Sequence, residues 1–290
     1  MKQANILITG ATGHIGTTLA KHLSAQGVPF RAMVRTTDHL ANTIAALPGA
    51  EIVTGDFNDA NSLALALKGI ERAFLLTNSS EEAGKLQSNF VSVAVKSGLP
   101  HIVKLSQLHA AAQSPVRFLR YHAAVEEEIR LSGMAYTFLR PNLFMQGLLG
   151  FRETIATQNK FFATAGNASI SLVDTRDIAA VAAAALTSSG HEGKTYDITG
   201  PQPLTHAALA ESLSHALGRT IRYINVTDAE LLPALLHAGF PAWQAEGLIE
   251  DYAHYARGEA AAVSTAVMDV TGKPARSFSS FAAEYAPAFS

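Results

Sequence analysis

The first half of the chain alternates short apolar runs with longer amphipathic stretches. The runs are rich in β-branched residues and have the length of strands, and the stretches between them are long enough for helices. This alternation is typical of a parallel sheet with helices on its faces. The sequence therefore predicts an α/β fold with a doubly wound sheet, whose strands we place at 5–9, 30–35, 51–54, 72–77, 101–106 and 136–140.

The regular alternation ends after Pro141. Short strand candidates at 168–173, 195–198 and 221–225 lie among alanine-rich helical segments. We therefore predict a first domain over 1–150 and a smaller, mostly α-helical C-terminal lobe over 151–290. A predicted helix at 174–186 makes the segment 171–190 return to the first domain.

Composition and charge narrow the class of protein. Hydrophobic residues make up 48% of the chain and charged residues 16%, which is typical of a globular protein with a sizeable core. A net charge of −2 offers no basic footprint, so we expect no binding to nucleic acid. The chain has no cysteine, which excludes disulfides and thiolate metal sites.

The N-terminus and the hydropathy predict the location. The chain opens directly on the first strand and leaves no room for a secretion signal. The longest apolar run of the second half, 178–186, is far shorter than the roughly 20 residues that span a bilayer. We therefore expect a cytoplasmic protein without a membrane segment.

The strongest motif directly follows the first strand and opens the next helix. In Gly10-Ala11-Thr12-Gly13-His14-Ile15-Gly16, the first glycine permits a tight turn and the second lets the backbone approach a pyrophosphate. The third lets helix and sheet pack closely, and the helix N-terminus offers N–H groups to the anion. The motif predicts a Rossmann-type domain that binds a dinucleotide through Gly10, Thr12, Gly13, His14, Ile15 and Gly16.

The ends of the second and third strands bear on the choice of dinucleotide. An NAD-binding domain usually has an acidic residue about 20 residues beyond the glycines, where it bonds the ribose 2′-hydroxyl. Arg35 stands there instead, and a guanidinium suits a 2′-phosphate, so we predict NADP(H); the alternative is a solvated arginine at a strand end. Asp56 and Phe57 either border the adenine or belong to a helix cap.

Together these features resemble the NmrA-like, atypical branch of the short-chain dehydrogenase/reductase superfamily, which includes NADPH-dependent quinone reductases and triphenylmethane dye reductases. The resemblance covers nearly the whole chain. Beside the glycine loop it is carried by 34–35, 55–56, His122 with Glu126, 132–133, 136–141, 173–174, 176–179 and 196–201. It implies that Thr77, Asn78, Lys104 and Ser106 lie near the nicotinamide ribose, and that Pro141 and Asn142 border the nicotinamide ring.

The chain departs from the superfamily in its catalytic residues. Typical members use Tyr-x-x-x-Lys, but Tyr121 is followed four positions later by Val125, and His122 stands where similar proteins often carry the lysine. His122 and Glu126 are four residues apart, so they share a helical face and can hydrogen-bond. We predict that His122 acts on cofactor ribose or substrate; the alternative is a helix-capping or packing role.

Lys104 is the second catalytic candidate, because it interrupts an apolar strand and its ammonium needs a partner. A ribose, a phosphate or a carboxylate would serve, and the alternative is a side chain that extends to water. No spacing of histidines and carboxylates predicts a metal site. The expected contacts to substrate, in addition to Asn142, are Phe144, Met145 and Trp243, although the helical spacing over 245–256 favours core packing.

These observations predict an NADPH-dependent reductase that passes hydride to a conjugated or aromatic small molecule, such as a quinone, an azo or triphenylmethane dye, an enone or an imine. A non-enzymatic NADP(H)-sensing regulatory protein, acting through a protein partner, is the alternative. A nucleotide-sugar epimerase shares the glycine loop but normally requires the missing tyrosine. A homodimer is possible, and the sequence does not decide the oligomeric state.

Overall fold

The structure is a computed structural model that describes residues 4–290, and these residues form two units. Unit 1 consists of Met1–Gln113, described from Ala4, with Leu119–Arg140 and Ile178–Tyr196. Unit 2 consists of Ser114–Phe118, Pro141–Asp177 and Asp197–Ser290.

The division differs in detail from the sequence boundary at residue 150. Residues 141–150 belong to unit 2, because Met145 and Leu148 are buried in its hydrophobic core. The chain then returns to unit 1 over 178–196.

A seven-stranded sheet in the order β3-β2-β1-β4-β5-β6-β9 forms the centre of unit 1. The register between neighbours from β3 to β6 is parallel throughout, which confirms the predicted doubly wound sheet. Strands β1, β2 and β5 are buried along their whole length, as expected for central strands covered on both faces. The strands are β1 (Ile6–Ile8), β2 (Phe30–Val34), β3 (Ala50–Thr54), β4 (Arg72–Leu75), β5 (His101–Leu105), β6 (Ala135–Pro141) and β9 (Lys194–Ile198).

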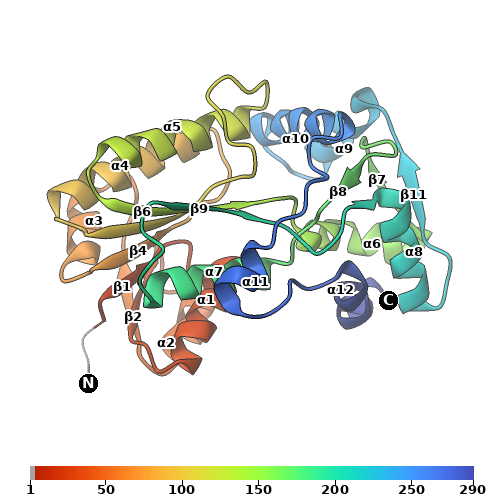
Figure 1. The fold of residues 1–290 in the computed structure, drawn as a ribbon. Coiled ribbons are helices and arrows are strands. Elements are labelled where there is room, and N and C mark those ends of the chain that lie inside the picture. The colour runs from red at the N-terminus through yellow and green to blue at the C-terminus, as the bar shows by residue number, and fades with distance from the viewer. Residues whose placement is uncertain (1–3) are drawn as a thin grey trace. The chain divides into compact units, whose positions relative to one another are not determined.

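Helices cover both faces of this sheet (Figure 1). One face carries α1 (His14–Ala25), α2 (His39–Ala45) and α7 (Thr175–Thr187), and the other carries α3 (Ala60–Leu67), α4 (Ala83–Lys96) and α5 (Arg117–Leu131). On the second face Phe90, Ile129 and Phe138 are fully buried in one apolar cluster. No helix within residues 4–290 is long and apolar enough to cross a membrane.

The strand order reverses beside β1, whose neighbours are β2 and β4. In open parallel sheets, ligands bind outside the carboxyl ends of the strands at this reversal. Because the strands are parallel, their carboxyl ends share one edge of the sheet. The residues that follow these ends are predicted site residues: Gly10, Arg35, Asp56, Thr77 and Ser106.

Unit 2 is built from helices and two small sheets around its own core. Strand β7 pairs with β11 in parallel and β8 pairs with β10 antiparallel. The sequence prediction missed β7 and β10, which are only four and two residues long. The elements are η1 (Met145–Phe151), α6 (Arg152–Gln158), β7 (Lys160–Ala163), β8 (Ser169–Ile170), β10 (Leu204–Thr205), α8 (His206–Leu217), β11 (Arg222–Asn225), α9 (Asp228–His237), α10 (Ala242–Ala256), α11 (Ala266–Thr271), α12 (Phe278–Tyr285) and η2 (Ala286–Phe289).

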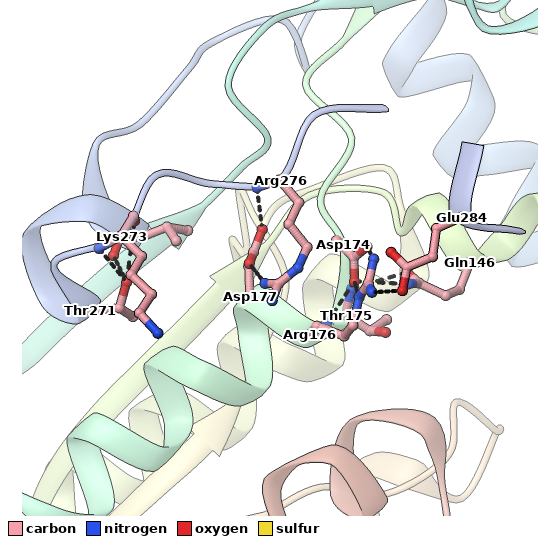
Figure 2. Close-up of polar contacts among 10 residues, drawn as sticks. Gln146, Asp174, Thr175, Arg176, Asp177, Thr271, Lys273, Arg276 and Glu284 are labelled. Atoms are coloured by element: carbon pink, nitrogen blue, oxygen red, sulfur yellow. Dashed lines mark hydrogen bonds and ion pairs between the residues drawn. The ribbon is translucent and has the colours of Figure 1, made fainter. Parts of the chain in front are cut away.

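Ion pairs link the C-terminal segment of unit 2 to Asp174 and the first turn of α7 (Figure 2). The buried carboxylate of Asp174 accepts hydrogen bonds from Arg176, whose guanidinium also reaches Glu284 Oε1 at 2.6 Å. Asp177 is likewise buried and pairs with Arg276. Each buried acid thus has a cationic partner, which is the condition for burying a carboxylate at low cost.

Candidate active site

Backbone geometry explains two of the glycines in the loop after β1. Gly10 has φ +61°, in the left-handed region that favours glycine. A Cβ on Gly16 would stand 2.2 Å from the carbonyl oxygen of Gly10 and 2.7 Å from Ala11 Cα, so only glycine fits. These two positions therefore shape the turn and hold α1 against it.

Gly13 differs, because nothing in the structure excludes a side chain there. It is the N-cap of α1, it is exposed, and the nearest atom to a Cβ would be Gly10 O at 3.4 Å. No side chain caps the helix, and its first turn has no acidic residue. The first-turn N–H groups thus have no side-chain cap and carry a partial positive charge, which fits a phosphate group.

Arg35 directly follows β2 and is exposed, and no ion pair to it is found within residues 4–290. Arg31, four residues earlier, is by contrast mostly buried and paired with Glu51 at 3.0 Å. The two arginines of this strand therefore have different surroundings: one is bound within the fold, and the other has its charge available at the carboxyl edge.

Asp56 and Phe57 follow β3 by two and three residues. Asp56 Oδ1 accepts a hydrogen bond from the backbone N–H of Asn58 at 2.8 Å, so this carboxylate stabilises the local turn. The N-cap of α3 is Asp59 rather than Asp56. The Phe57 ring packs against Phe90 with centroids 5.9 Å apart. Contact with the adenine stays a prediction for both residues.

Thr77 and Asn78 follow β4 at the same edge. Thr77 Oγ1 accepts a hydrogen bond from the amide of Gln87 on α4 at 2.8 Å, which fixes the rotamer of the threonine. Asn78 is exposed.

Lys104 on β5 is completely buried. Its Nζ donates to the carbonyl of Leu105 at 2.9 Å and lies 2.8 Å from Nδ1 of His122 on α5. The partners of the Lys104 Nζ are thus an imidazole and a backbone carbonyl. The side chain does not extend to water. Burial disfavours the ammonium and lowers the lysine pKa to about 7, even though the nearby Glu126 opposes the shift.

His122 is held neutral by its surroundings. Burial, followed by the charges of Lys104 and Arg140, keeps its pKa well below the ordinary value for histidine. When the Lys104 ammonium donates to Nδ1, the imidazole proton resides on Nε2. Within residues 4–290, Nε2 has no hydrogen-bond partner, while the ring itself packs on the Tyr121 ring in a tilted arrangement with centroids 4.2 Å apart. His122 is therefore a neutral N–H donor backed by a lysine.

The expected hydrogen bond between His122 and Glu126 is absent, and that prediction was wrong. The buried Glu126 carboxylate accepts from Ser106 Oγ at 2.6 Å, from Arg140 Nη2 at 2.6 Å and from Arg130 Nη2 at 3.0 Å. Burial raises the pKa of Glu126, but the bonds from Arg140 and Ser106 outweigh burial and hold that pKa below its ordinary value. A bidentate guanidinium satisfies a buried carboxylate better than a neutral imidazole does.

The residues after β6 open unit 2, and Asn142 is buried there. Its Nδ2 donates to Ser171 Oγ at 2.8 Å and to the carbonyl of Ala260 at 2.9 Å, while Oδ1 accepts from Leu143 N. This predicted contact residue is thus tied into unit 2 through its whole side chain. Met145 is 1% exposed and belongs to the core of unit 2.

A cavity of about 590 Å³ lies wholly within unit 2. Its wall is mostly apolar, and η1, α8, α9 and α10 contribute to it. Phe144, a predicted contact to substrate, lines this cavity, as do Leu248 and Tyr252 from the helical segment 245–256 for which the sequence favoured core packing. The aromatic side chains in the wall are Phe144, Phe151, Phe161, Phe162, Phe240 and Tyr252.

Trp243 is not among the residues that line the cavity. Its ring packs on Phe118 with centroids 5.3 Å apart and lies 5.6 Å from the Arg117 guanidinium. Arg117 is in turn bound by Glu246 and Glu250 of α10. In the structure, Trp243 stabilises the attachment of α10 within unit 2.

Comparison with known proteins shows the family. The model of the NmrA-like family matches residues 2–281. The chain belongs to the NmrA-like family. An NAD(P)H azoreductase of Xenophilus azovorans is 36% identical to this NmrA-like chain over 284 residues, which cover 98% of this chain and 99% of the relative.

Two solved structures resemble this one over nearly their full length. The NADPH-dependent quinone oxidoreductase of Escherichia coli in complex with NADPH has a TM-score of 0.87 at 28% identity, covering 96% of this chain and 99% of that one. The triphenylmethane reductase of Citrobacter sp. complexed with NADP(H) has a TM-score of 0.86 at 29% identity, covering 97% and 99%.

Sequence reasoning missed two polar residues of interest, Arg140 in unit 1 and His206 in unit 2. Arg140 stands in the strand motif 136–141, where a charge among apolar residues was a signal of a buried ion pair. His206 begins α8 and lines the cavity, and no motif in the sequence pointed to it. Among residues 4–290 there is no group of three or more histidines and carboxylates that could hold a metal ion.

Proposed function

We propose that this NmrA-like protein is an NADPH-dependent reductase that transfers a hydride to a conjugated or aromatic small molecule. The proposal assigns the cofactor to the glycine loop of unit 1 and the acceptor to the cavity of unit 2. Relatives named as azoreductase and quinone oxidoreductase, at 36% and 31% identity, support the reaction class.

The observation that carries the proposal is the uncapped N-terminus of α1 at Gly13. The exposed N–H groups there fit a pyrophosphate, and the available charge of Arg35 fits a 2′-phosphate. The bound dinucleotide would supply a hydride to the acceptor. Two related structures, complexed with NADPH and NADP(H), support the choice of cofactor.

We assign to His122 and Lys104 the transfer of the proton that the acceptor takes up after it has received the hydride. His122 Nε2–H gives its proton to the reduced acceptor, and Nδ1 takes a proton from the Lys104 ammonium 2.8 Å away. The imidazole ends neutral with its proton moved from Nε2 to Nδ1, and the lysine ends as a neutral amine. A lysine pKa of about 7 makes this transfer inexpensive near neutral pH.

The acceptor class follows from the group that would contact the acceptor, because the neutral imidazole N–H of His122 is a weaker acid than a tyrosine hydroxyl. Hydride addition to an isolated ketone puts negative charge on one oxygen, which needs a nearby acid such as the tyrosine of Tyr-x-x-x-Lys. A quinone, an azo dye, an enone or an imine spreads that charge, and a triphenylmethane dye begins positive. The aromatic wall of the cavity suits such flat molecules.

The test is NADPH oxidation by purified, flavin-free and metal-free protein. The panel comprises quinones, azo and triphenylmethane dyes, enones, imines and an aliphatic ketone as the control. We expect turnover with at least one conjugated acceptor. Tight NADPH binding with uniform inactivity would contradict the reductase and favour the NADP(H)-sensing protein.

A further inference from the structure

His206 is the one strongly polar side chain in the buried wall of the unit 2 cavity among the described residues. It is 3% exposed, and its ring lies between the aromatic rings of Phe161, Tyr223 and Tyr252, with centroid distances of 5.0 to 6.2 Å. Neither ring nitrogen has a hydrogen-bond partner within residues 4–290, and Nδ1 is fully buried. A buried polar group without a hydrogen-bond partner destabilises the fold, so a ligand that supplies the partner gains affinity.

The charge state of this histidine is fixed by the same surroundings. Burial in an aromatic environment lowers the pKa of His206 to about 4, and no carboxylate offsets that shift. The imidazole is therefore neutral over the physiological range. It offers a ligand one N–H and one lone pair, but no positive charge.

The remaining charges of the cavity disfavour an anion. No lysine or arginine lines it in the described part of the chain, and its two carboxylates, Glu153 and Glu230, are exposed. Glu230 is occupied by the backbone N–H and hydroxyl of Thr227, each at 2.8 Å. A sulfonate or carboxylate on the ligand would find no cation within this wall.

We infer that the cavity selects uncharged, flat aromatic molecules that carry one hydroxyl or carbonyl group, and that His206 recognises this group through Nε2, the ring nitrogen that is not fully buried. The inference rests on the proposed function, because it names the specificity of the assigned acceptor site. The inference can be tested separately from the proposed function, because recognition of the ligand by His206 requires neither NADPH nor turnover.

The test measures binding of three probes by calorimetry in the absence of NADPH: azobenzene, para-hydroxyazobenzene and the sulfonated derivative of the latter. The wild-type protein should bind the hydroxylated probe about tenfold more tightly than azobenzene, as one hydrogen bond inside the cavity contributes. It should bind the sulfonated probe at least tenfold more weakly than its uncharged parent.

Two variants and a control locate the effect. His206→Phe keeps the aromatic packing and should reduce the hydroxyl preference to about one, with azobenzene binding retained. Ala234→Trp, on the exposed side of α9 where it lines the cavity, should weaken both uncharged probes. The control is His215→Phe, which changes an exposed histidine of α8, the helix that also carries His206, and it should leave all three affinities unchanged.

Several outcomes would overturn the inference: no binding of either uncharged probe, a hydroxyl preference that survives His206→Phe, or binding that Ala234→Trp leaves intact. Should His206→Phe fail to fold, the Ala234→Trp and sulfonate results still decide whether the probes occupy this cavity and whether it rejects anions. Failure of NADPH oxidation with these binding results intact would refute the reductase alone. Normal NADPH oxidation without the hydroxyl preference would refute only the role of His206.

Discussion

Gly16→Ala should lower the stability of the fold, whereas Gly13→Ala should weaken cofactor binding and leave the stability nearly unchanged. At Gly16 the new Cβ would lie 2.2 Å from Gly10 O and 2.7 Å from Ala11 Cα. Both contacts are backbone atoms of a turn that packs on Leu76, so relief requires movement of the whole loop. Overpacking of this kind costs about 1–3 kcal/mol, and a chain of this size then loses roughly 2–4 °C in Tm per kcal/mol.

At Gly13 the same substitution finds room within the fold. The nearest atom would be 3.4 Å away, and the backbone at φ −78° and ψ 171° suits any residue. Stability should therefore change by less than about 1 kcal/mol. The side chain instead fills the space in front of the α1 N-terminus, and loss of charge-assisted hydrogen bonds there should weaken NADPH binding roughly tenfold to a hundredfold.

Thermal unfolding followed by circular dichroism and calorimetric titration with NADPH measure the two effects separately. Gly13→Val, which is bulkier at the same position, should abolish binding and retain the fold. Normal NADPH affinity in both Gly13 variants would refute the assignment of the loop as the pyrophosphate site. An unchanged Tm in Gly16→Ala would refute the steric argument for the third glycine.

Three further predictions concern the cofactor phosphate, the proton and the acceptor. NADPH should bind at least about tenfold more tightly than NADH, and Arg35→Asp should erase or reverse that preference; equal dissociation constants by calorimetry would contradict it. The reduction rate of the wild-type protein should fall as pH rises through about 7, because the Lys104 ammonium loses its proton there. The Lys104→Met variant should reduce the acceptor slowly at every pH, and its rate should show no such fall near pH 7. A pH profile that Lys104→Met leaves unchanged would exclude the relay. His122→Ala should lower the rate with quinones and leave NADPH binding intact, while efficient reduction of an aliphatic ketone by the wild-type protein would reveal an acid not identified in the structure.

The sequence by itself determined the sheet and the edge to which we assign the cofactor site. Periodicity and glycine spacing are local signals, and a parallel sheet necessarily brings the carboxyl ends of its strands to one edge. Gly10, Arg35 and Ser106 lie at that edge because each comes one or two residues after the end of a strand. Within unit 2 the sequence prediction was incomplete, since it missed the short strands β7 and β10.

Only the tertiary structure decided which polar groups pair. The spacing of His122 and Glu126 placed them on one helical face, but Arg140, fourteen residues beyond Glu126, competes for the carboxylate and binds it with two hydrogen bonds. His122 is left to Lys104, eighteen residues earlier in the chain. His206 likewise acquires its aromatic surroundings from β7, β11 and α10. Buried polar groups pair by the strength and geometry of the partners that the fold brings to them, and distance along the chain does not encode that competition.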